Sequence, residues 1–211
     1  MTAIRLTDVT KSFRQVPVLR NVTLEVPFGA CYSVQGPNGS GKSVLFRLMC
    51  GFLRPDSGTV YIAPELMGKG RVFPEQFGVV IDHPGYLGNR SGRENLEALA
   101  AIRGRIGTAE IEQALVRVGL DPDTPQKVAA YSLGMKQKLA LAQAFMEDQQ
   151  VLLLDEPFNA LDKESVQQTT ALLRSFLDDG RTIVFTSHHD AEVESLAHVK
   201  FSIEGQTLVK L

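Results

Sequence analysis

Residues 36–43 read GPNGSGKS, and this octapeptide decides how the rest of the chain is interpreted. It matches G-x-x-x-x-G-K-[ST], in which the glycines let successive backbone N–H groups turn inward toward phosphate oxygens. A β-prone run, residues 30–35, precedes it, and a segment with helical spacing, residues 43–50, follows it. This strand–loop–helix context argues against a chance glycine-rich turn. The predicted phosphate-binding residues are Gly36, Pro37, Asn38, Gly39, Ser40, Gly41, Lys42 and Ser43.

A second acidic motif predicts a metal site beside this loop. Lys42 offers a point charge to the β- and γ-phosphates, and Ser43 offers the hard oxygen that Mg²⁺ prefers. Residues 151–157 read VLLLDEP, a fully buried parallel strand followed by two acids. Ligands of such sheets bind beyond the carboxyl ends of the strands, so we expect Asp155 to hold Mg²⁺. Glu156 is expected to orient or deprotonate an attacking water; a solvated acidic turn is the alternative.

The hydrophobic pattern divides the chain into β-rich ends and a helical middle. Alternating apolar residues predict antiparallel strands near residues 4–9 and 22–26. Further strands are expected at residues 59–63, 78–81, 151–154 and 182–186, helices within 95–118, 132–146 and 163–177, and a hairpin at 199–210. The block before the VLLLDEP strand lacks strand patterns, so we interpret it as a helical insertion.

Composition excludes several classes of protein. The 211 residues carry 22 basic and 24 acidic side chains, a formal net charge of −2, which excludes a generally basic nucleic-acid binder. Aromatic residues make up 7% and Trp is absent, which disfavours a base-stacking platform. The apolar runs fall far short of the roughly 20 residues that span a bilayer. Cys31 and Cys50 could pair, but buried thiols in a reduced cytoplasmic protein are the preferred interpretation.

Three further motifs carry a family resemblance. Residues 131–135 read YSLGM, residues 159–162 read NALD and residues 186–188 read TSH. In this order and spacing they resemble the signature, D-loop and switch histidine of an ATP-binding-cassette (ABC) ATPase, from Ile4 to about Leu208. The resemblance implies an α/β fold, with a P-loop NTPase (RecA-like) core, an N-terminal antiparallel β-part and an inserted α-helical sub-domain.

The implied domain organisation is one ABC ATPase domain over residues 1–211. Residues 1–81 and 150–211 would form the α/β core with its antiparallel part, and residues 85–147 the helical sub-domain.

The resemblance also assigns site residues that the spacing alone does not. In the family two cassettes sandwich two ATP molecules, which implies that the signature contacts the γ-phosphate held by the other cassette. The implied residues are Ser132, Gly134 and Met135 of the signature, Asp162 of the D-loop, Phe13 and Val18 on adenine, and His188 beside Glu156 in catalysis. Phe13 in the core and His188 on the surface are the alternatives; a metal site at His188-His189-Asp190 is disfavoured.

The sequence departs from the family pattern at three places. Leu133 and Met135 stand at the third and fifth positions of the usual Leu-Ser-Gly-Gly-Gln signature. Asp82 stands where the Q-loop glutamine is usual, so it becomes a candidate metal ligand, shorter and charged beside phosphate. Val44 replaces the hydroxyl residue that often follows the loop serine.

The resemblance implies an ATP-binding, ATP-hydrolysing subunit, with ATP and Mg²⁺ as cofactors, that powers a separate membrane-spanning chain. Residues 82–96 are similar to those of single-cassette exporters of drugs or peptide antibiotics, so export is the expected direction. The expected partners are the membrane-spanning transporter subunit and a second cassette, identical or paralogous, without nucleic acid. The chain would lie on the cytoplasmic face of the cell membrane through its partner.

A soluble ABC-type ATPase of DNA repair or translation is the alternative function. Chromosome-type members carry long coiled coils between the phosphate loop and the signature, and the interval from Ser43 to Ser132 holds no sustained heptads. Translation-type members carry two cassettes in one chain, and we find one phosphate loop. A non-catalytic cassette is disfavoured by Glu156 and His188.

Overall fold

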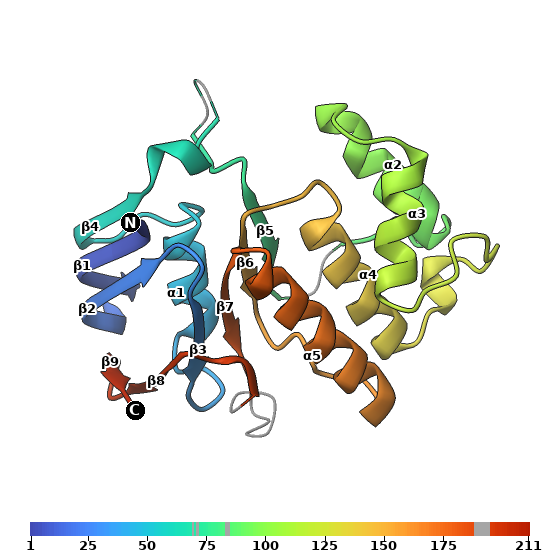
Figure 1. The fold of residues 1–211 in the computed structure, drawn as a ribbon. Coiled ribbons are helices and arrows are strands. Elements are labelled where there is room, and N and C mark those ends of the chain that lie inside the picture. The colour runs from blue at the N-terminus through green and yellow to red at the C-terminus, as the bar shows by residue number, and fades with distance from the viewer. Residues whose placement is uncertain (69, 71, 83–84, 188–194) are drawn as a thin grey trace.

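The computed structural model describes residues 1–68, 70, 72–82, 85–187 and 195–211. Figure 1 shows two sheets with helices packed between and beside them. Within the described ranges, the smaller sheet has three strands in the order β2-β1-β4. Its strands are β1 (Thr2–Phe13), β2 (Val16–Pro27) and β4 (Ser57–Ile62), all antiparallel.

The larger sheet carries the edge on which the site is built. Over the described residues it has six strands in the order β5-β6-β7-β3-β8-β9. The strands are β3 (Cys31–Gln35), β5 (Phe77–Val80), β6 (Val151–Leu154), β7 (Thr182–Thr186), β8 (Val199–Glu204) and β9 (Thr207–Lys210). All neighbours are parallel except β9, which closes the predicted hairpin with β8. The carboxyl ends of β5, β6, β7 and β3 therefore share one edge.

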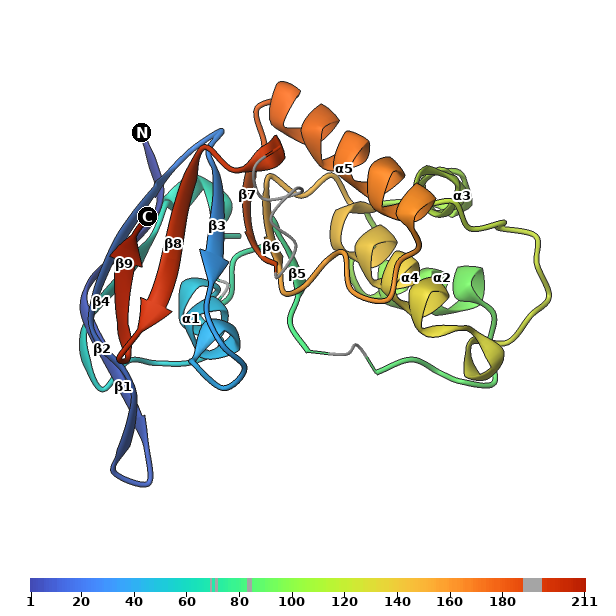
Figure 2. The same cartoon turned by 90° about the horizontal axis from the view of Figure 1, so that it is seen from below.

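Helices cover both faces of the larger sheet. The helices are α1 (Lys42–Met49), α2 (Gly92–Arg103), α3 (Thr108–Arg117), α4 (Leu133–Phe145) and α5 (Lys163–Asp178), with short 3₁₀ turns η1 (Pro64–Leu66) and η2 (Val128–Ala130). Figures 1 and 2 show α1 between the two sheets and α2, α3 and α4 together beyond the opposite face. Of the helices in the described part of the chain, none combines the length and apolarity needed to cross a bilayer.

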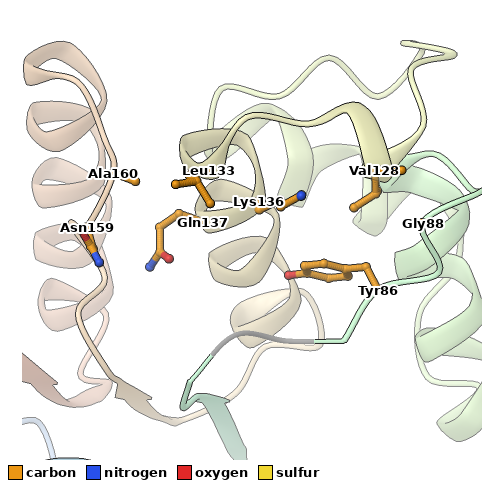
Figure 3. A pocket seen from close by; sticks show the side chains of 9 residues that line it. Tyr86, Gly88, Val128, Leu133, Lys136, Gln137, Asn159 and Ala160 are labelled. Atoms are coloured by element: carbon orange, nitrogen blue, oxygen red, sulfur yellow. The ribbon is translucent and has the colours of Figure 1, made fainter.

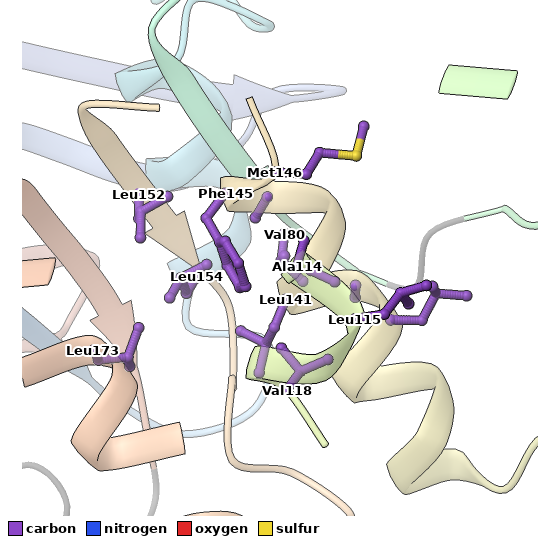
Figure 4. Packing of buried hydrophobic residues seen from close by; sticks show 14 of the residues in the cluster. Val80, Ala114, Leu115, Val118, Leu141, Phe145, Met146, Leu152, Leu154 and Leu173 are labelled. Carbon is purple, nitrogen blue, oxygen red and sulfur yellow. The ribbon is translucent and has the colours of Figure 1, made fainter. Parts of the chain in front are cut away.

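Strand β6 is covered on both faces, which explains why its sequence is an unbroken apolar run. Leu152 and Leu154 belong to the hydrophobic cluster formed with α3, α4 and α5, part of which is shown in Figure 4. Val151 and Leu153 belong to the cluster on the other face, with α1 and the antiparallel sheet. Because successive side chains of a strand point to opposite faces, a strand covered on both sides needs apolar residues throughout.

A glycine sets the distance between α4 and the sheet. A Cβ on Gly78 of β5 would lie 1.7 Å from the carbonyl oxygen of Ala144, near the end of α4. Only a residue without a side chain therefore permits this approach of helix to strand, which is a known use of glycine within strands.

A capping box formed by Ser91 and Glu94 caps the N-terminus of α2. The Ser91 hydroxyl accepts a hydrogen bond from the Glu94 N–H, and the Glu94 carboxylate accepts one from the Ser91 N–H. The buried Asn95 side chain then bonds both the N–H and the carbonyl of Leu87. These contacts fix the segment that leads from β5 to the helices.

Both cysteines are free and buried, Cys31 in β3 and Cys50 at the end of α1. They belong to different hydrophobic clusters, on opposite faces of the larger sheet. The disulfide considered from the sequence is therefore not formed, and the thiols pack as small apolar groups.

Candidate active site

The glycine-rich loop joins the carboxyl end of β3 to the start of α1. Gly41 has φ +106, and a Cβ there would lie 2.9 Å from Val18 Cγ1, so this position needs glycine. The Lys42 ammonium lies inside the curl of the loop, where it donates to the carbonyls of Gly36, at 2.7 Å, and Pro37, at 3.3 Å. The loop thus holds its lysine at the place where the sequence predicts phosphate.

A hydrogen bond joins this loop to the acidic motif. Ser43 Oγ donates to Asp155 Oδ2 at 2.5 Å. The Asp155 N–H in turn donates to the Val80 carbonyl at 2.7 Å, which ties the end of β6 to the end of β5. The structure therefore brings together the hydroxyl and carboxylate that the sequence proposes as metal ligands, and both supply the hard oxygens that suit Mg²⁺.

Glu156 is held in an uncommon backbone conformation. Its φ is +52, in the left-handed region that residues other than glycine rarely adopt. Its N–H donates to Thr186 Oγ1 at 2.7 Å, and its carbonyl accepts from the N–H of Asn159 at 3.1 Å. The Gln137 side-chain amide, on α4, donates to the same carbonyl at 3.1 Å.

Lys42, Ser43, Asp155 and Glu156 line one cleft of about 450 Å³. Its lining residues are Phe13, Val18, Asn38, Gly39, Gly41, Lys42, Ser43, Val44, Asp82, Gln137, Asp155, Glu156 and Asn159. Phe13 is 45% exposed, so its placement in the core, considered from the sequence, is wrong. The lining thus combines an aromatic ring, a cation, a hydroxyl and carboxylates, the groups that suit the base, the phosphates and the metal ion of a nucleoside triphosphate.

Asp82 faces this cleft but already has a cationic partner. Its carboxylate pairs with the Arg47 guanidinium on α1. Both side chains are partly exposed, at 55% for Asp82 and 41% for Arg47, so the pair is weak. Asp82 as metal ligand stays a prediction.

The signature residues lie apart from the cleft. Ser132 caps the N-terminus of α4, where its hydroxyl accepts from the Met135 N–H at 3.1 Å. A Cβ on Gly134 would lie 2.7 Å from the Ala160 carbonyl oxygen, so this glycine lets α4 approach the segment after β6. None of Ser132, Gly134 and Met135 is among the residues that line the cleft of their own chain.

A second cavity, of about 480 Å³, is lined by residues of the first turns of α4, of the segment after β6, and of the segments that contain Tyr86 and Val128. Figure 3 shows Tyr86 and Gly88 on one side, Asn159 and Ala160 on the other, and Gln137 between α4 and Asn159. Gln137 and Asn159 line both cavities, so they connect the signature helix to the cleft.

Asp162 of the predicted D-loop is a helix cap. Its carboxylate accepts from the Ser165 N–H at 2.8 Å at the start of α5. That hydrogen bond lowers the pKa of the Asp162 carboxyl, because it stabilises the charged form.

His188, the predicted switch histidine, lies outside the described residues, as do His189 and Asp190. The sequence reasoning missed Thr186 and Gln137 as site residues. Thr186 carried a usable signal, since it is a polar residue that ends a buried strand at the same sheet edge as Asp155. Gln137 carried none, because its contact is made across the fold.

Comparison with known proteins identifies the family. The family model described as ABC transporter matches residues 19–159. The uncharacterized ABC transporter ATP-binding protein YybJ of Bacillus subtilis (strain 168) is 35% identical over 93% of this chain and 90% of that protein. The bacitracin transport ATP-binding protein BcrA of Enterococcus faecalis is 35% identical over 93% of this chain and 64% of its own length. The lantibiotic transport ATP-binding protein SrtF of Streptococcus pyogenes is 30% identical over 98% of this chain and 90% of that protein.

Solved structures share the fold. The dimeric structure of a post-hydrolysis state of the ATP-binding cassette MJ0796 bound to ADP and Pi has a TM-score of 0.86. It is 23% identical and covers 99% of this chain and 98% of that one. The likeness shows a shared fold, an α/β core with an added antiparallel sheet and helices, as the sequence predicts.

Proposed function

The chain belongs to the ABC transporter family, and on this premise we propose that it is the ATP-binding, ATP-hydrolysing subunit that powers a separate membrane-spanning chain. Its curated relatives are ATP-binding proteins of transporters, so the alternative of a soluble ATPase in DNA repair or translation is set aside. We divide the domain into a core, residues 1–81 and 150–211, and a helical sub-domain, residues 85–147.

ATP would bind along the cleft with its phosphates in the glycine-rich loop. The loop N–H groups and the start of α1 attract the anion, and the Lys42 ammonium exchanges the Gly36 and Pro37 carbonyls for phosphate oxygens. Phe13, which is exposed and lines the cleft, would stack on the adenine, with Val18 beside it.

Hydrolysis would use the acids at the sheet edge. Glu156 would take a proton from the attacking water, whose oxygen forms a bond to the γ-phosphorus. The bond between the γ-phosphorus and the oxygen that bridges to the β-phosphate breaks, which gives ADP and phosphate. Ser43 and Asp155 would hold Mg²⁺, a role that fits their two hydrogen-bonded oxygens. When bound, the ion would neutralise charge on the transferring phosphoryl group. His188 completes the proposed catalytic residues.

The signature would act across a cassette dimer. Ser132, Gly134 and Met135 lie outside the cleft of their own chain, and Ser132 caps a helix N-terminus that favours anions. We therefore place these residues against the γ-phosphate held by a second cassette, with Asp162 near the contact. Dimeric cassettes are the subject of two solved structures with this fold, which supports the arrangement.

The transporter would be an exporter. Relatives are named for bacitracin transport, lantibiotic transport and Nod factor export. By this likeness the chain would sit on the cytoplasmic face of the membrane through its partner and act without nucleic acid.

The bond between Ser43 and Asp155, beside Lys42, carries the proposal, since it joins the phosphate loop to the acidic pair at one point. The test is ATP titration and steady-state ATP hydrolysis in Mg²⁺ with the wild type, Lys42→Ala and the matched control Lys210→Ala on β9. Loss of the Lys42 ammonium should weaken ATP binding by about tenfold or more, because hydrogen bonds to charged groups contribute about 1.5–3 kcal/mol. Equal affinity in all three proteins would contradict the proposal.

A further inference from the structure

Thr186 lies between the two acids of the site, at the carboxyl end of β7. Every residue of β7 is buried, and Thr186 has no exposed surface. Valine has nearly the same shape, so burial alone gives no reason for a hydroxyl here. A buried hydroxyl is tolerated where it is hydrogen-bonded, and this one makes two bonds that both reach the candidate active site.

The two bonds use the hydroxyl as donor and as acceptor. Thr186 Oγ1 donates to Asp155 Oδ1 at 2.7 Å and accepts from the Glu156 N–H at 2.7 Å. The other oxygen of Asp155 accepts from Ser43. An unbroken chain of hydrogen bonds therefore runs from the phosphate loop through Asp155 and Thr186 to Glu156.

The backbone of Glu156 needs such support. A residue other than glycine with φ +52 is strained, and this strain persists only where the surroundings over-determine the conformation. The carbonyl side is held by Asn159 and Gln137, which lie next to each other in Figure 3. The N–H side is held by Thr186.

We propose that Thr186 is a positioning residue for ATP hydrolysis. Its hydroxyl fixes the rotamer of the Asp155 carboxylate and locks the main chain of Glu156 in the left-handed conformation. Thr186 itself does not touch the substrate. The inference rests on the proposed function, in which Asp155 holds the metal and Glu156 is the base.

The chain supplies a matched control on the same strand. Thr182, at the start of β7, is also fully buried, and its hydroxyl accepts from the Gly29 N–H at 3.0 Å. It lies at the sheet edge opposite the site. Thr182→Val therefore removes the same group from the same strand, with a comparable effect on stability, and leaves the acids untouched.

The experiment compares Thr186→Val, Thr186→Ser and Thr182→Val in steady-state ATP hydrolysis at varied ATP and Mg²⁺, with melting temperatures. Thr186→Val should lower kcat by about 10- to 100-fold, the cost of a misplaced group, with KM for ATP changed less than about threefold. Its half-saturating Mg²⁺ concentration should rise, since Asp155 loses a partner. Thr186→Ser keeps the hydroxyl and should restore most of the turnover, while Thr182→Val should turn over like the wild type.

A folded Thr186→Val with wild-type kcat and Mg²⁺ dependence would overturn the proposal. Equal losses of kcat in Thr186→Val and Thr182→Val would also overturn it, because a general effect on stability would then explain both. If Thr186→Val gives no folded protein, Thr186→Cys, with similar volume and a weak donor, takes its place under the same criteria.

Glu156→Gln, measured in parallel, separates this inference from the proposed function. If Glu156→Gln is inactive while Thr186→Val is fully active, only the role of Thr186 fails. If Glu156→Gln hydrolyses ATP at the wild-type rate, Glu156 is not the general base. The proposed function then fails at this residue, and Thr186 has no catalytic group to position.

Discussion

The guanidinium of Arg47, on α1, pairs with the carboxylate of Asp82, which follows β5. Asp82 lines the cleft, and it has a positive φ of +58. An exposed ion pair of this kind contributes about 0–1 kcal/mol to stability, so little free energy is needed to separate the Asp82 carboxylate from Arg47. Asp82 is therefore paired in the structure and yet available to a stronger cation.

Asp82→Asn should raise the half-saturating Mg²⁺ concentration for ATP hydrolysis by about tenfold or more, the usual cost of disturbing a metal site. The stability should change by less than about 1 kcal/mol, because only an exposed ion pair is lost. Mn²⁺-substituted electron paramagnetic resonance on Asp82→Ala gives an independent measure. An unchanged Mn²⁺ spectrum would remove Asp82 from the metal ligands, and Arg47→Gln is the control for loss of the pair alone.

Glu156→Gln should lower kcat by at least about 100-fold, because the amide cannot accept the proton of the attacking water. ATP binding should persist, since the loop and Lys42 are untouched. Single-turnover hydrolysis and ATP titration measure the two effects separately. Glu164→Gln, an acid in the first turn of α5, is the control with the same charge change. Turnover above about a tenth of the wild-type rate would contradict the general base.

The sequence predicted the strands and helices because their causes are local. Alternating apolar residues predict that β1 and β2 are covered on one face, and the unbroken apolar run predicts that β6 is covered on both. The structure confirms the antiparallel pair of β1 and β2 and the buried strand β6. The boundaries differ slightly: β4 begins at Ser57, two residues before the predicted start, because pairing with β1 extends to Thr10. Pairing partners of this kind are not encoded in the strand itself.

The candidate site was predictable only where it follows a motif. The loop and the acidic pair have fixed spacing, so their residues could be named before their contacts were known. Thr186, Gln137 and Arg47 act through bonds between distant segments, and a single sequence does not carry those pairings. For Phe13 the sequence leaves both the core and the cleft open, because tertiary packing decides its exposure.

Gly78→Ala should destabilise the protein strongly, because the new Cβ would lie 1.7 Å from the Ala144 carbonyl oxygen. Both atoms belong to packed backbone, so α4 has to move away from β5, at a cost of about 3 kcal/mol or more. Urea denaturation measures the change in unfolding free energy. At Gly85 a Cβ would meet nothing within 4 Å, so Gly85→Ala should stay within about 0.5 kcal/mol. Similar values for the two variants would show that α4 does not depend on this glycine.

The two buried thiols should be inert in the folded protein. Burial raises the pKa of Cys31 to about 12 and that of Cys50 to about 11, because desolvation disfavours the thiolate. The thiolate is the nucleophile, so iodoacetamide at pH 8 should label both residues only after unfolding in guanidinium, as read by mass spectrometry. The folded pKa values lie above 9.0, the ordinary pKa of a thiol. This contribution to stability is therefore complete below pH 9 and is lost as the pH rises through 11 and 12. Rapid labelling of either thiol under native conditions would show that its strand or helix opens readily.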